Sequence, residues 1–379
     1  MKKVLFTGPI GGVYGRDVEA NLVAKALENH YDLSFFSTGS VSKNPVCIEK
    51  IKNAKISSLR YEYLKNPILY FFAFVSWLMN KFDKRLEDFS KNKINTKLIN
   101  KIKWDLKFLE NQIKDKDLVI CFVQISSSYL SEIIQICNRF NVKIIIRTTG
   151  QIKDCPIECR LIQLVDLFIH HSINNKNSLE IHCQHKFEII DQASTLEEKL
   201  LNIQPISKNQ EFIFGYLGRL EQDKGIIEII DVAIKLNIKL IIAGDGVLRE
   251  TVEDRIKSNE NIKYIGYLKQ EEIEKFFKQI NIFIINSKTE TGPLTGLEAM
   301  CASCFIISRK VGSMTTRLSG NENIWIQNDL KKAIDEFLLL DKNQIIEKSI
   351  GNRNIYIKNY SLDIIKNKYL EATNKVINA

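Results

Sequence analysis

The sequence predicts an α/β protein made of two doubly wound domains, each built on a parallel sheet. Short uninterrupted runs of apolar and β-branched residues recur along the chain, and segments with helical periodicity separate them. Strands of a parallel sheet that helices cover on both faces show this pattern. The pattern occurs twice, and the 379 residues are roughly two to three times the usual length of one domain.

The first series of strands and helices occupies the amino-terminal half. Apolar residues of the segment 17–29 fall on one helical face, which predicts a helix after the first strand. A long interruption at 56–116 separates the second strand from the third. The expected strands are 3–8, 32–36, 118–123, 143–147, 167–170 and 186–190, and two further helices are expected near 128–140 and 158–165.

The second series begins after a polar stretch. Pro205 and the residues 207–210 are the best candidates for a linker. We therefore expect an amino-terminal domain at 1–205 and a second domain at 206–354. A last helix at 355–379 is expected to cross back onto the first domain. The expected strands of the second domain are 211–218, 239–244, 262–266, 282–286 and 305–308.

The composition is that of an ordinary globular protein. Hydrophobic residues make up 45% and charged residues 26% of the chain, which excludes a largely disordered, collagen-like or simple coiled-coil protein. The 54 Lys and Arg residues outnumber the 45 Asp and Glu residues, which gives a formal charge of +9. This moderate excess suits anionic partners such as phosphates, nucleic acids or an acidic membrane surface.

Several features of the sequence indicate a cytoplasmic protein. The apolar run Val4–Phe6 is too short for the core of a signal peptide. The eight cysteines are spread through a long chain, so reduced thiols fit better than a disulfide framework. The longest near-continuous apolar run, Ile68–Met79, has 12 residues, which is well short of the roughly 20 that a membrane-spanning helix needs.

The most informative motif is the segment 286–298, NSKTETGPLTGLE, which lies between an expected strand and an expected helix. Gly292 lets the backbone approach a ligand closely, and Pro293 is pre-set for the first helical turn. The free N–H groups of Leu294 and Thr295 then point outward with the positive end of the helix dipole. This arrangement predicts an anion site.

Two glutamates flank this predicted anion site. Glu290 lies in the loop and Glu298 about one turn into the helix, with seven residues between them. They are either solvated residues at the start of a helix or carboxylates that bind a ligand, and their spacing alone does not decide between these interpretations.

A second loop carries two cations. In the segment 215–225, GYLGRLEQDKG, Arg219 and Lys224 follow the first strand of the second domain and lie between glycines. Arginine offers a bidentate fork and lysine a point charge, so the pair suits a diphosphate, although an ordinary surface loop is the alternative. A glycine-rich turn at 241–246, IIAGDG, follows the next strand and is a common turn sequence by itself.

The order of these motifs is more specific than any one of them. GYLGRLEQDKG, IIAGDG, YIGYL (264–268) and ETGPLTGLEAM (290–300) together resemble the nucleotide-binding domain of the family-4 retaining glycosyltransferases, which have the GT-B fold. The resemblance covers roughly 210–313. The segment 8–27 also resembles the glycine-rich loop and first helix of that family. The resemblance implies two Rossmann-like domains that face each other across a cleft.

The resemblance also implies roles for individual residues. Arg219 and Lys224 match the pair that neutralises the donor diphosphate, and Glu290 matches a carboxylate near the donor sugar, so these three are the candidate catalytic residues. Glu298 matches the carboxylate that binds the ribose hydroxyls, and Tyr267 lies where the family seats the base. The candidate donor-binding residues are Gly11, Gly12, Arg219, Lys224, Gly266, Tyr267, Leu268, Gly292, Leu294, Thr295 and Glu298.

Some departures from the family pattern concern the shape of the site. The family commonly has Phe-Gly where this chain has Gly292 and Pro293, and a Gly and a Pro where it has Ser303 and Phe305. A histidine often ends the strand near the acceptor, whereas this chain has RTTG at 147–150. The sequence therefore assigns no acceptor-side catalytic residue.

The implied activity is that of a hexosyltransferase that moves a sugar, with retention, from a nucleotide-diphosphate sugar to a glycan or lipid-linked acceptor. The resemblance implies a role in the assembly of cell-surface polysaccharide, glycolipid or glycoconjugate, with no catalytic metal and no cofactor. Two alternatives are a non-catalytic GT-B-like binding subunit and a basic nucleic-acid-binding protein. No recognised nucleic-acid motif is present, so no nucleic-acid partner is expected. An epimerase or a phosphorylase on the same architecture is a further alternative.

Histidines and cysteines cluster in two places. Four of the five histidines lie at 170–185, close to Cys155 and Cys159. Their spacing matches no zinc pattern, and we expect no metal site. The segment CASC at 301–304 has the spacing of a redox motif, but its cysteines fit core packing better.

The interruption at 56–116 has a composition of its own. Pro67 precedes the apolar run ILYFFAFVSWLM, and residues 80–116 then carry 11 Lys and Arg residues against 6 Asp and Glu residues. This order is typical of an interfacial anchor, which would hold the protein at the inner face of a membrane through 68–116. The alternative is an insertion that buries its apolar helix against the first domain.

Overall fold

The computed structural model of the chain contains two compact α/β units, each built on one parallel sheet, which confirms the predicted fold class. The described residues are 1–13, 15–81, 85–98 and 100–379. The first unit consists of Met1–Ile190 and Lys366–Ala379, and the second of Asp191–Ile365.

Among the described residues, the sheet of the first unit has seven strands in the order β3-β2-β1-β4-β5-β6-β7. Neighbouring strands are parallel, and the chain fills the sheet outward in both directions from β1, as in a doubly wound fold. The edge strand β3 has three residues, too few for a periodic pattern, and was not predicted. The strands are β1 (Lys3–Gly8), β2 (Asp32–Ser37), β3 (Ile56–Ser58), β4 (Leu118–Val123), β5 (Lys143–Thr148), β6 (Leu167–His170) and β7 (Phe187–Ile189).

Helices cover this sheet because its strands are apolar on both faces. Side chains of α5, α6 and α7 pack with alternate residues of β4 and β5, such as Val119 and Ile144, in one continuous core. The helices are α1 (Gly15–Leu27), α2 (Leu59–Leu64), α3 (Pro67–Met79), α4 (Lys93–Leu98), α5 (Lys101–Ile113), α6 (Leu130–Arg139), α7 (Cys159–Ile162) and α8 (Ile173–Glu180), with short 3₁₀ turns at η1 (Val46–Ile48) and η2 (Leu86–Phe89).

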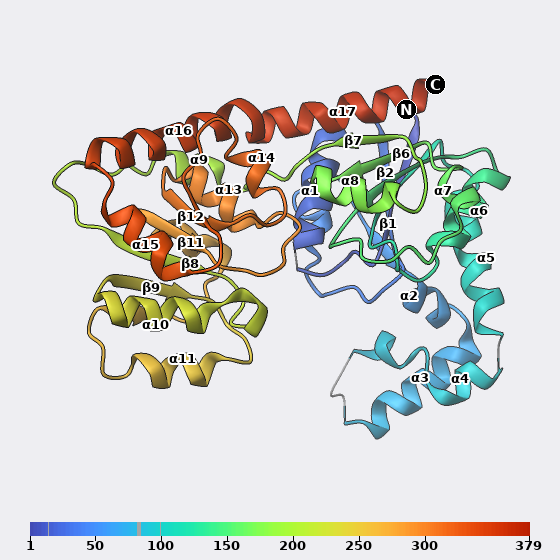
Figure 1. Ribbon diagram of the computed structural model, residues 1–379. Coiled ribbons are helices and arrows are strands. Elements are labelled where there is room, and N and C mark those ends of the chain that lie inside the picture. Colours follow the sequence, from blue (N-terminus) through green and yellow to red (C-terminus); the bar gives the residue numbers. More distant parts are fainter. Residues whose placement is uncertain (14, 82–84, 99) are drawn as a thin grey trace. The chain divides into compact units, whose positions relative to one another are not determined.

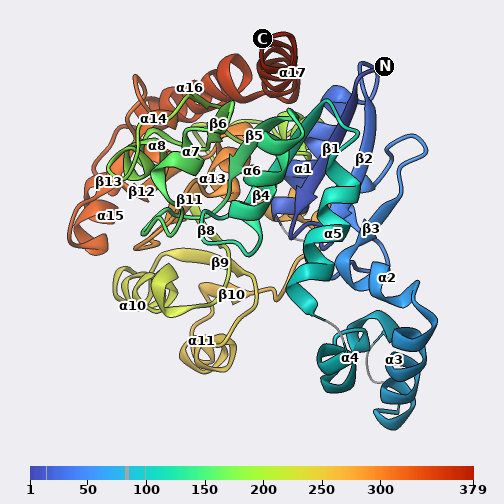
Figure 2. The same cartoon turned by 90° about the vertical axis from the view of Figure 1, so that its right-hand side faces the viewer.

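The insertion at 56–116 forms α2 to α5, and α3 and α4 lie together away from the sheet of the first unit (Figures 1 and 2). Helix α3 buries only Leu69 and Ala73. Phe72, Val75 and Trp77 are half-buried, and its other apolar side chains are exposed. The interpretation that this helix is buried against the first domain is therefore wrong for much of its surface. Among the described helices, none combines the length and the apolar character needed to span a bilayer.

The part of the second unit that the structure describes has a six-stranded parallel sheet in the order β10-β9-β8-β11-β12-β13. Alternate side chains along each strand point to opposite faces: Phe305 and Ile307 join one core, and Ile306 joins the other. The short edge strand β13 was not predicted. The strands are β8 (Ile213–Leu217), β9 (Lys239–Ala243), β10 (Ile262–Tyr264), β11 (Ile282–Ile285), β12 (Phe305–Arg309) and β13 (Ile324–Ile326).

The second unit begins at Asp191, before the expected boundary near Pro205. The reason is apolar burial, because Leu196, Leu200 and Ile203 pack into a core of the second unit. Its helices are α9 (Glu197–Leu201), α10 (Ile226–Leu236), α11 (Arg249–Ile256), α12 (Ile273–Phe277), α13 (Leu294–Cys301), α14 (Met314–Arg317), α15 (Leu330–Leu338) and α16 (Lys342–Tyr360), with 3₁₀ turns at η3 (Gln222–Lys224) and η4 (Gln270–Glu272).

The carboxyl-terminal segment contains two helices where one was expected. α16 ends at Tyr360, and α17 (Leu362–Asn378) follows after Ser361, whose ψ of 153° is not helical. The residues of α17 from Lys366 onward belong to the first unit. There the two ends of the chain are neighbours (Figure 1), because Lys2 Nζ donates a hydrogen bond to Ile377 O at 2.9 Å.

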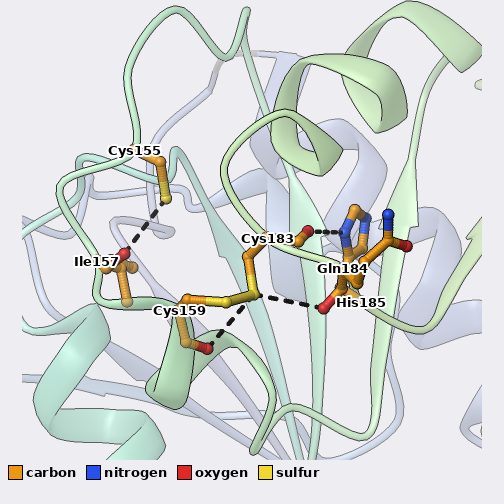
Figure 3. Close-up of a disulfide and its surroundings, with 6 residues drawn as sticks. All are labelled: Cys155, Ile157, Cys159, Cys183, Gln184 and His185. Carbon is orange, nitrogen blue, oxygen red and sulfur yellow. Dashed lines mark hydrogen bonds between the residues drawn. A yellow bond between two sulfur atoms is a disulfide. The ribbon is translucent and has the colours of Figure 1, made fainter.

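Among the described cysteines, one pair forms a disulfide, Cys159 with Cys183 (Figure 3). Their Cα atoms are 5.3 Å apart, within the range that a disulfide bridges. The expectation of reduced thiols is therefore wrong for this pair, because the start of α7 and the segment after α8 bring together residues that are distant in sequence. Cys301 and Cys304 are free and buried in a core of the second unit.

Candidate functional site

A pocket of about 220 Å³ lies at the carboxyl ends of β8 and β11, which are neighbours in the sheet of the second unit. After β8 the chain continues to β9 on one side, and after β11 it continues to β12 on the other. Doubly wound domains bind ligands at such a switch point, where the two connections diverge. The predicted residues that line the pocket are Arg219, Lys224, Glu290, Leu294 and Thr295.

Lys224 is a buried cation of this pocket. It ends η3 and is 7% exposed. Its Nζ donates a hydrogen bond to Glu290 Oε1 at 2.7 Å and lies 3.3 Å from Asp223 Oδ2. A buried ammonium needs such partners, because an unpaired charge is costly to remove from water. The structure therefore brings two of the predicted catalytic residues, Lys224 and Glu290, into direct contact.

Arg219 lies nearer the solvent. Its side chain is 66% exposed, and its guanidinium pairs with Glu221 Oε1 at 2.7 Å. Its backbone carbonyl accepts a hydrogen bond from the hydroxyl of the buried Tyr216 at 2.7 Å. Burial, together with Glu290 and Asp223, raises the pKa of Tyr216, so its hydroxyl stays protonated and holds the Arg219 backbone in place.

Helix α13 begins at the pocket. Pro293, with a φ of −61°, is its N-cap, and Leu294 and Thr295 are its first residues. Within the described chain, no acceptor is hydrogen-bonded to the backbone N–H of Leu294 or Thr295. These N–H groups and the positive end of the helix dipole act in the same direction as the charge of Lys224. The pocket therefore fits an anionic group.

Glu298 lies one turn into α13 and is 4% exposed. In the described part of the chain its carboxylate has one hydrogen bond, from Ser194 Oγ at 3.5 Å. Burial raises the pKa of Glu298 to about 7, and the Ser194 hydroxyl opposes this shift only weakly. Glu298 is therefore a carboxylate with unused acceptor capacity, although it is not among the residues that line the pocket.

The segment Gly266–Leu268, predicted to seat the base, follows β10 and reaches the pocket loop through two backbone contacts. Gly244 N donates to Gly266 O at 2.9 Å, and Gly218 N donates to Ala243 O at 3.1 Å. A Cβ on Gly244, whose φ is +137°, would lie 1.8 Å from Gly218 O, so only glycine fits there. Tyr267 is 70% exposed and does not line the pocket.

Gly292 supports the pocket loop from behind. A Cβ at this position would lie 2.5 Å from Ser313 Oγ and 3.0 Å from Arg317 Nη2. The chain therefore needs a glycine here for close packing against α14 and the residue before it, and Gly292 is not among the pocket-lining residues.

Gly11 and Gly12 lie in the first unit, after β1. Their N–H groups donate to Oδ1 of the buried Asp17 at 2.6 and 2.9 Å. These two amides are therefore already bonded within their own loop. The RTTG segment is also engaged: Arg147 is fully buried and donates to Glu19 Oε1 at 2.6 Å, so it is a structural cation of the first unit.

Several residues that line the pocket were not predicted as site residues, and two of them are polar, Tyr216 in β8 and Ser287 after β11. Both stand at or just after the carboxyl end of a strand, within a motif that was recognised. The rule that strand ends line the ligand site of a doubly wound domain is the signal that would have found them.

In the histidine-rich segment, the buried His170 pairs with the half-buried His185. The Nε2 atoms of His170 and His185 are 3.0 Å apart, and His185 lies beside the disulfide (Figure 3). Burial, followed by the neighbouring His185, lowers the pKa of His170 to about 3. Over the described ranges, no group of three or more His, Cys, Asp or Glu residues is arranged to hold a metal ion.

Comparison with known proteins connects this pocket to a family. Residues 198–353, which include the whole pocket, match the model of the glycosyl transferases group 1. This part of the chain is therefore similar to the group 1 glycosyltransferases. The match confirms the resemblance to glycosyltransferases that the ordered motifs of the second half indicated.

Relatives and solved structures agree with this assignment. The alpha-monoglucosyldiacylglycerol synthase of Acholeplasma laidlawii is 25% identical over 183 residues, 46% of this chain and 45% of that protein. The capsular polysaccharide biosynthesis glycosyltransferase CapM of Staphylococcus aureus is 23% identical over 155 residues, 38% of this chain and 40% of that protein. The match therefore covers less than half of the length of these two relatives.

One solved structure extends the likeness to the whole chain. HepE of Anabaena, solved in complex with UDP, superposes with a TM-score of 0.72 at 12% identity and covers 99% of this chain and 100% of its own. At this identity the likeness shows the fold alone. The chain thus has a GT-B fold, and the segment 198–353 that matches the family model lies within its second unit.

Proposed function

We propose that the protein transfers a sugar from a nucleoside-diphosphate sugar to an acceptor hydroxyl. The observation that supports this proposal best is the pocket at the ends of β8 and β11. It combines the buried Lys224, the exposed Arg219 and the uncovered N–H groups of Leu294 and Thr295. Four positive groups around one pocket suit a diphosphate leaving group better than a neutral ligand.

These groups act on charge that develops during the reaction. The bond between the sugar C1 and the diphosphate oxygen breaks, and the acceptor oxygen bonds to C1 on the same face. The acceptor proton passes to the leaving diphosphate oxygen. Because the acceptor bonds to C1 on the face from which the diphosphate leaves, the configuration is retained. Fixed cations and N–H groups stabilise the departing diphosphate more than the bound donor, and this difference accelerates transfer. The proposed reaction needs no metal and no cofactor besides the donor.

The two glutamates have separate roles in this proposal. Glu290, in contact with Lys224, faces the donor sugar and accepts hydrogen bonds from its hydroxyls. Glu298 accepts hydrogen bonds from the ribose, which suits a buried carboxylate with unused acceptor capacity. Gly266–Leu268 supply the surface for the base.

The names of similar proteins support a choice of donor and acceptor classes. HepE was solved with UDP, so a UDP-hexose is the first donor to examine. The named activities of the two curated relatives concern a glucosylated diacylglycerol and a capsular polysaccharide. We infer that the acceptor is a glycan or a lipid-linked molecule in the assembly of cell-surface polysaccharide or glycolipid.

A binding screen followed by a transfer assay tests this proposal. UDP-, GDP- and ADP-sugars are compared by thermal shift, and the best donor is then incubated with and without candidate acceptors. A donor that stabilises the protein and is consumed only with an acceptor supports transfer. Binding without turnover favours the non-catalytic subunit, conversion of the donor alone favours an epimerase, and stabilisation only by oligonucleotides contradicts the proposal.

We also infer that α3 contacts an anionic membrane surface. The exposed face of α3 carries aromatic and aliphatic side chains. Lys81 follows α3 in the chain, and Lys93 and Lys97 lie on α4, which contacts α3; among the described residues none of the three has an ion pair. An apolar helix face beside unpaired lysines matches the interface of an anionic bilayer, where each cation contributes about 1 kcal/mol. The exposed apolar residues of α3 are Ile68, Tyr70, Phe71, Phe74, Leu78 and Met79.

Vesicle co-sedimentation tests this inference. The protein is expected to bind vesicles that contain anionic lipid at low salt, and added salt should weaken the binding because it screens the lysines. The variant Phe71→Asp/Phe74→Asp should lose binding and stay folded, whereas Leu339→Asp, at a residue of the second unit that is 87% exposed, should keep it. Equal binding to neutral and anionic vesicles would contradict the inference.

A further inference from the structure

Arg317 is a fully buried guanidinium outside the pocket, at the end of α14. Its Nε and Nη2 donate to the two carboxylate oxygens of Asp191 at 2.8 and 2.7 Å. Its Nη1 donates to the backbone carbonyl of Pro293 at 2.6 Å. Every nitrogen of the guanidinium is therefore engaged within the second unit, and one of the bonds ends on the loop that supplies the pocket with N–H groups.

The hydrogen bond from Arg317 to Pro293 O also fixes the orientation of the next N–H group. The oxygen of Pro293 and the N–H of Leu294 belong to one planar, trans peptide group, so they point in opposite directions. Holding the oxygen at Arg317 therefore sets the direction of the Leu294 N–H. Leu294 lines the pocket, and its N–H has no acceptor in the described chain.

The packing around this peptide leaves it little freedom. Pro293 O also accepts a hydrogen bond from Gly296 N at 3.0 Å. A Cβ on Gly312, whose φ is +52°, would lie 2.5 Å from the backbone of Thr291. The segment before α14 and the loop before α13 are thus in close contact, with Arg317 as the polar link between them.

Asp191 holds Arg317 in this position. It is the first residue of the second unit, where the chain arrives from the first. A bidentate carboxylate pair orients the planar guanidinium more rigidly than a single bond does. Burying such a pair costs desolvation energy that its own attraction only partly offsets, so a positioning role accounts for it better than stability does.

We propose that Arg317, oriented by Asp191, is a positioning residue that aims the Leu294 N–H at the distal phosphate of the donor. The proposal rests on the proposed function, since it takes the pocket as a diphosphate site. Arg317 does not touch the ligand itself. Its loss should weaken the contact with the distal phosphate and leave the rest of the nucleotide in place.

The test compares the affinities for UDP and UMP, because these ligands differ in the distal phosphate alone. The wild-type protein is expected to bind UDP more tightly than UMP. In Arg317→Gln the affinity for UDP should fall roughly tenfold, the effect of losing a hydrogen bond to a charged group, while the affinity for UMP should change less than about twofold. A residue with a purely structural role would lower the melting temperature and change both affinities together.

A matched control is Arg353→Gln. Arg353 also donates to backbone carbonyls of the second unit, those of Cys301 and Ile203, at 2.9 and 2.7 Å. This variant is expected to lose stability and keep the ratio of the UDP and UMP affinities. The double variant Asp191→Asn/Arg317→Gln removes the buried charge from both partners and replaces Arg317→Gln in the test if that variant does not fold. Its preference for UDP over UMP should also fall.

The outcomes separate the two proposals. If the wild-type protein binds no nucleoside diphosphate more tightly than its monophosphate, with UDP, GDP and ADP examined in turn, the diphosphate site itself is wrong. If the wild-type protein has this preference and a folded Arg317 variant keeps it in full, the positioning role is wrong and the proposed function stands.

Discussion

Each unit buries a carboxylate in the helix that follows a central strand, and the two carboxylates have different surroundings. In the first unit, Asp17 of α1 is 3% exposed and accepts hydrogen bonds from the N–H groups of Gly11 and Gly12 at 2.6 and 2.9 Å. In the second, Glu298 of α13 is 4% exposed, and the one hydrogen bond to its carboxylate among the described residues comes from Ser194 at 3.5 Å.

The difference separates a structural carboxylate from one that suits a ligand. Asp17 accepts two short hydrogen bonds from the loop after β1, so the cost of its burial is compensated and that loop is closed. Glu298 accepts one long hydrogen bond among the described residues, which leaves much of the cost of its desolvation uncompensated. A fold retains such a group where a ligand supplies the missing donors. The N–H groups show the same contrast, since those of Leu294 and Thr295 have no acceptor in the described chain.

The largest effect is expected at Lys224, because it carries a charge to the open site of the second unit. Lys224→Ala should lower kcat at least about a hundredfold, the usual result of removing one preorganised group that stabilises developing charge. The measurement is turnover of the donor identified by the binding screen. Lys239→Ala removes an exposed lysine of β9 that pairs with Glu211 and should leave kcat unchanged.

Near-normal turnover in Lys224→Ala would mean that the open pocket of the second unit is not where the reaction occurs. The contrast between the two units would then describe packing alone. Arg219→Ala provides an independent second measurement at the same pocket, and turnover should fall about as far.

A smaller effect, on stability, is expected at Asp17. Asp17→Ala leaves the N–H groups of Gly11 and Gly12 without their acceptor, which should lower the free energy of unfolding by about 2 kcal/mol. Asp17→Asn keeps an acceptor oxygen and should retain most of that stability. Denaturant unfolding measures both variants, and the UDP affinity of each is measured in parallel.

The closed loop of the first unit is expected to contribute little to nucleotide binding. If Asp17→Ala keeps its stability and loses UDP affinity, Gly11 and Gly12 take part in donor binding through a rearranged loop. That result would support the role that the family resemblance implies for these glycines and would overturn the contrast.

The fold and the pocket were largely predictable because both depend on local patterns. Uninterrupted apolar runs such as Ile282–Ile285 mark buried parallel strands, and the loops that follow them line the site. The sequence did not show that Asp17 closes the loop of Gly11 and Gly12, since this depends on side-chain geometry. It also did not show the Cys159–Cys183 pair or the contact of Asp191 with Arg317, which join segments far apart in the chain.

Other differences follow from chain length and context. β3 and β13 have three residues each, so they offer no periodicity to recognise. The break between α16 and α17 lies at Ser361 within a continuous helical pattern, and only the backbone shows it. Apolar periodicity likewise did not show that α3 would leave Phe71 exposed.

The smallest expected effect concerns the pH dependence at Glu298, and it has opposite signs for folding and for binding. Burial raises the pKa of Glu298 from its usual 4.5 to about 7, so the folded protein holds this proton more tightly than the unfolded chain. The stability that Glu298 contributes is therefore fully present below about pH 4.5 and is lost as the pH rises through about 7. Ribose hydroxyls need the ionised carboxylate as an acceptor, so UDP affinity should rise over the same range.

Calorimetric titration of UDP between about pH 5.5 and 8.5 measures this dependence. The phosphate of UDP also titrates near pH 6, and the ratio of wild-type affinity to that of Glu298→Gln cancels this contribution. The ratio should be close to one at the acid end and rise to roughly tenfold above pH 7, where the ionised carboxylate contributes a charged hydrogen bond.

Glu290→Gln should leave UDP affinity nearly intact and impair transfer, because its partner is the donor sugar. A constant ratio across this range, or an equal loss of UDP affinity in both variants, would mean that the carboxylate of Glu298 has a structural role, as that of Asp17 has.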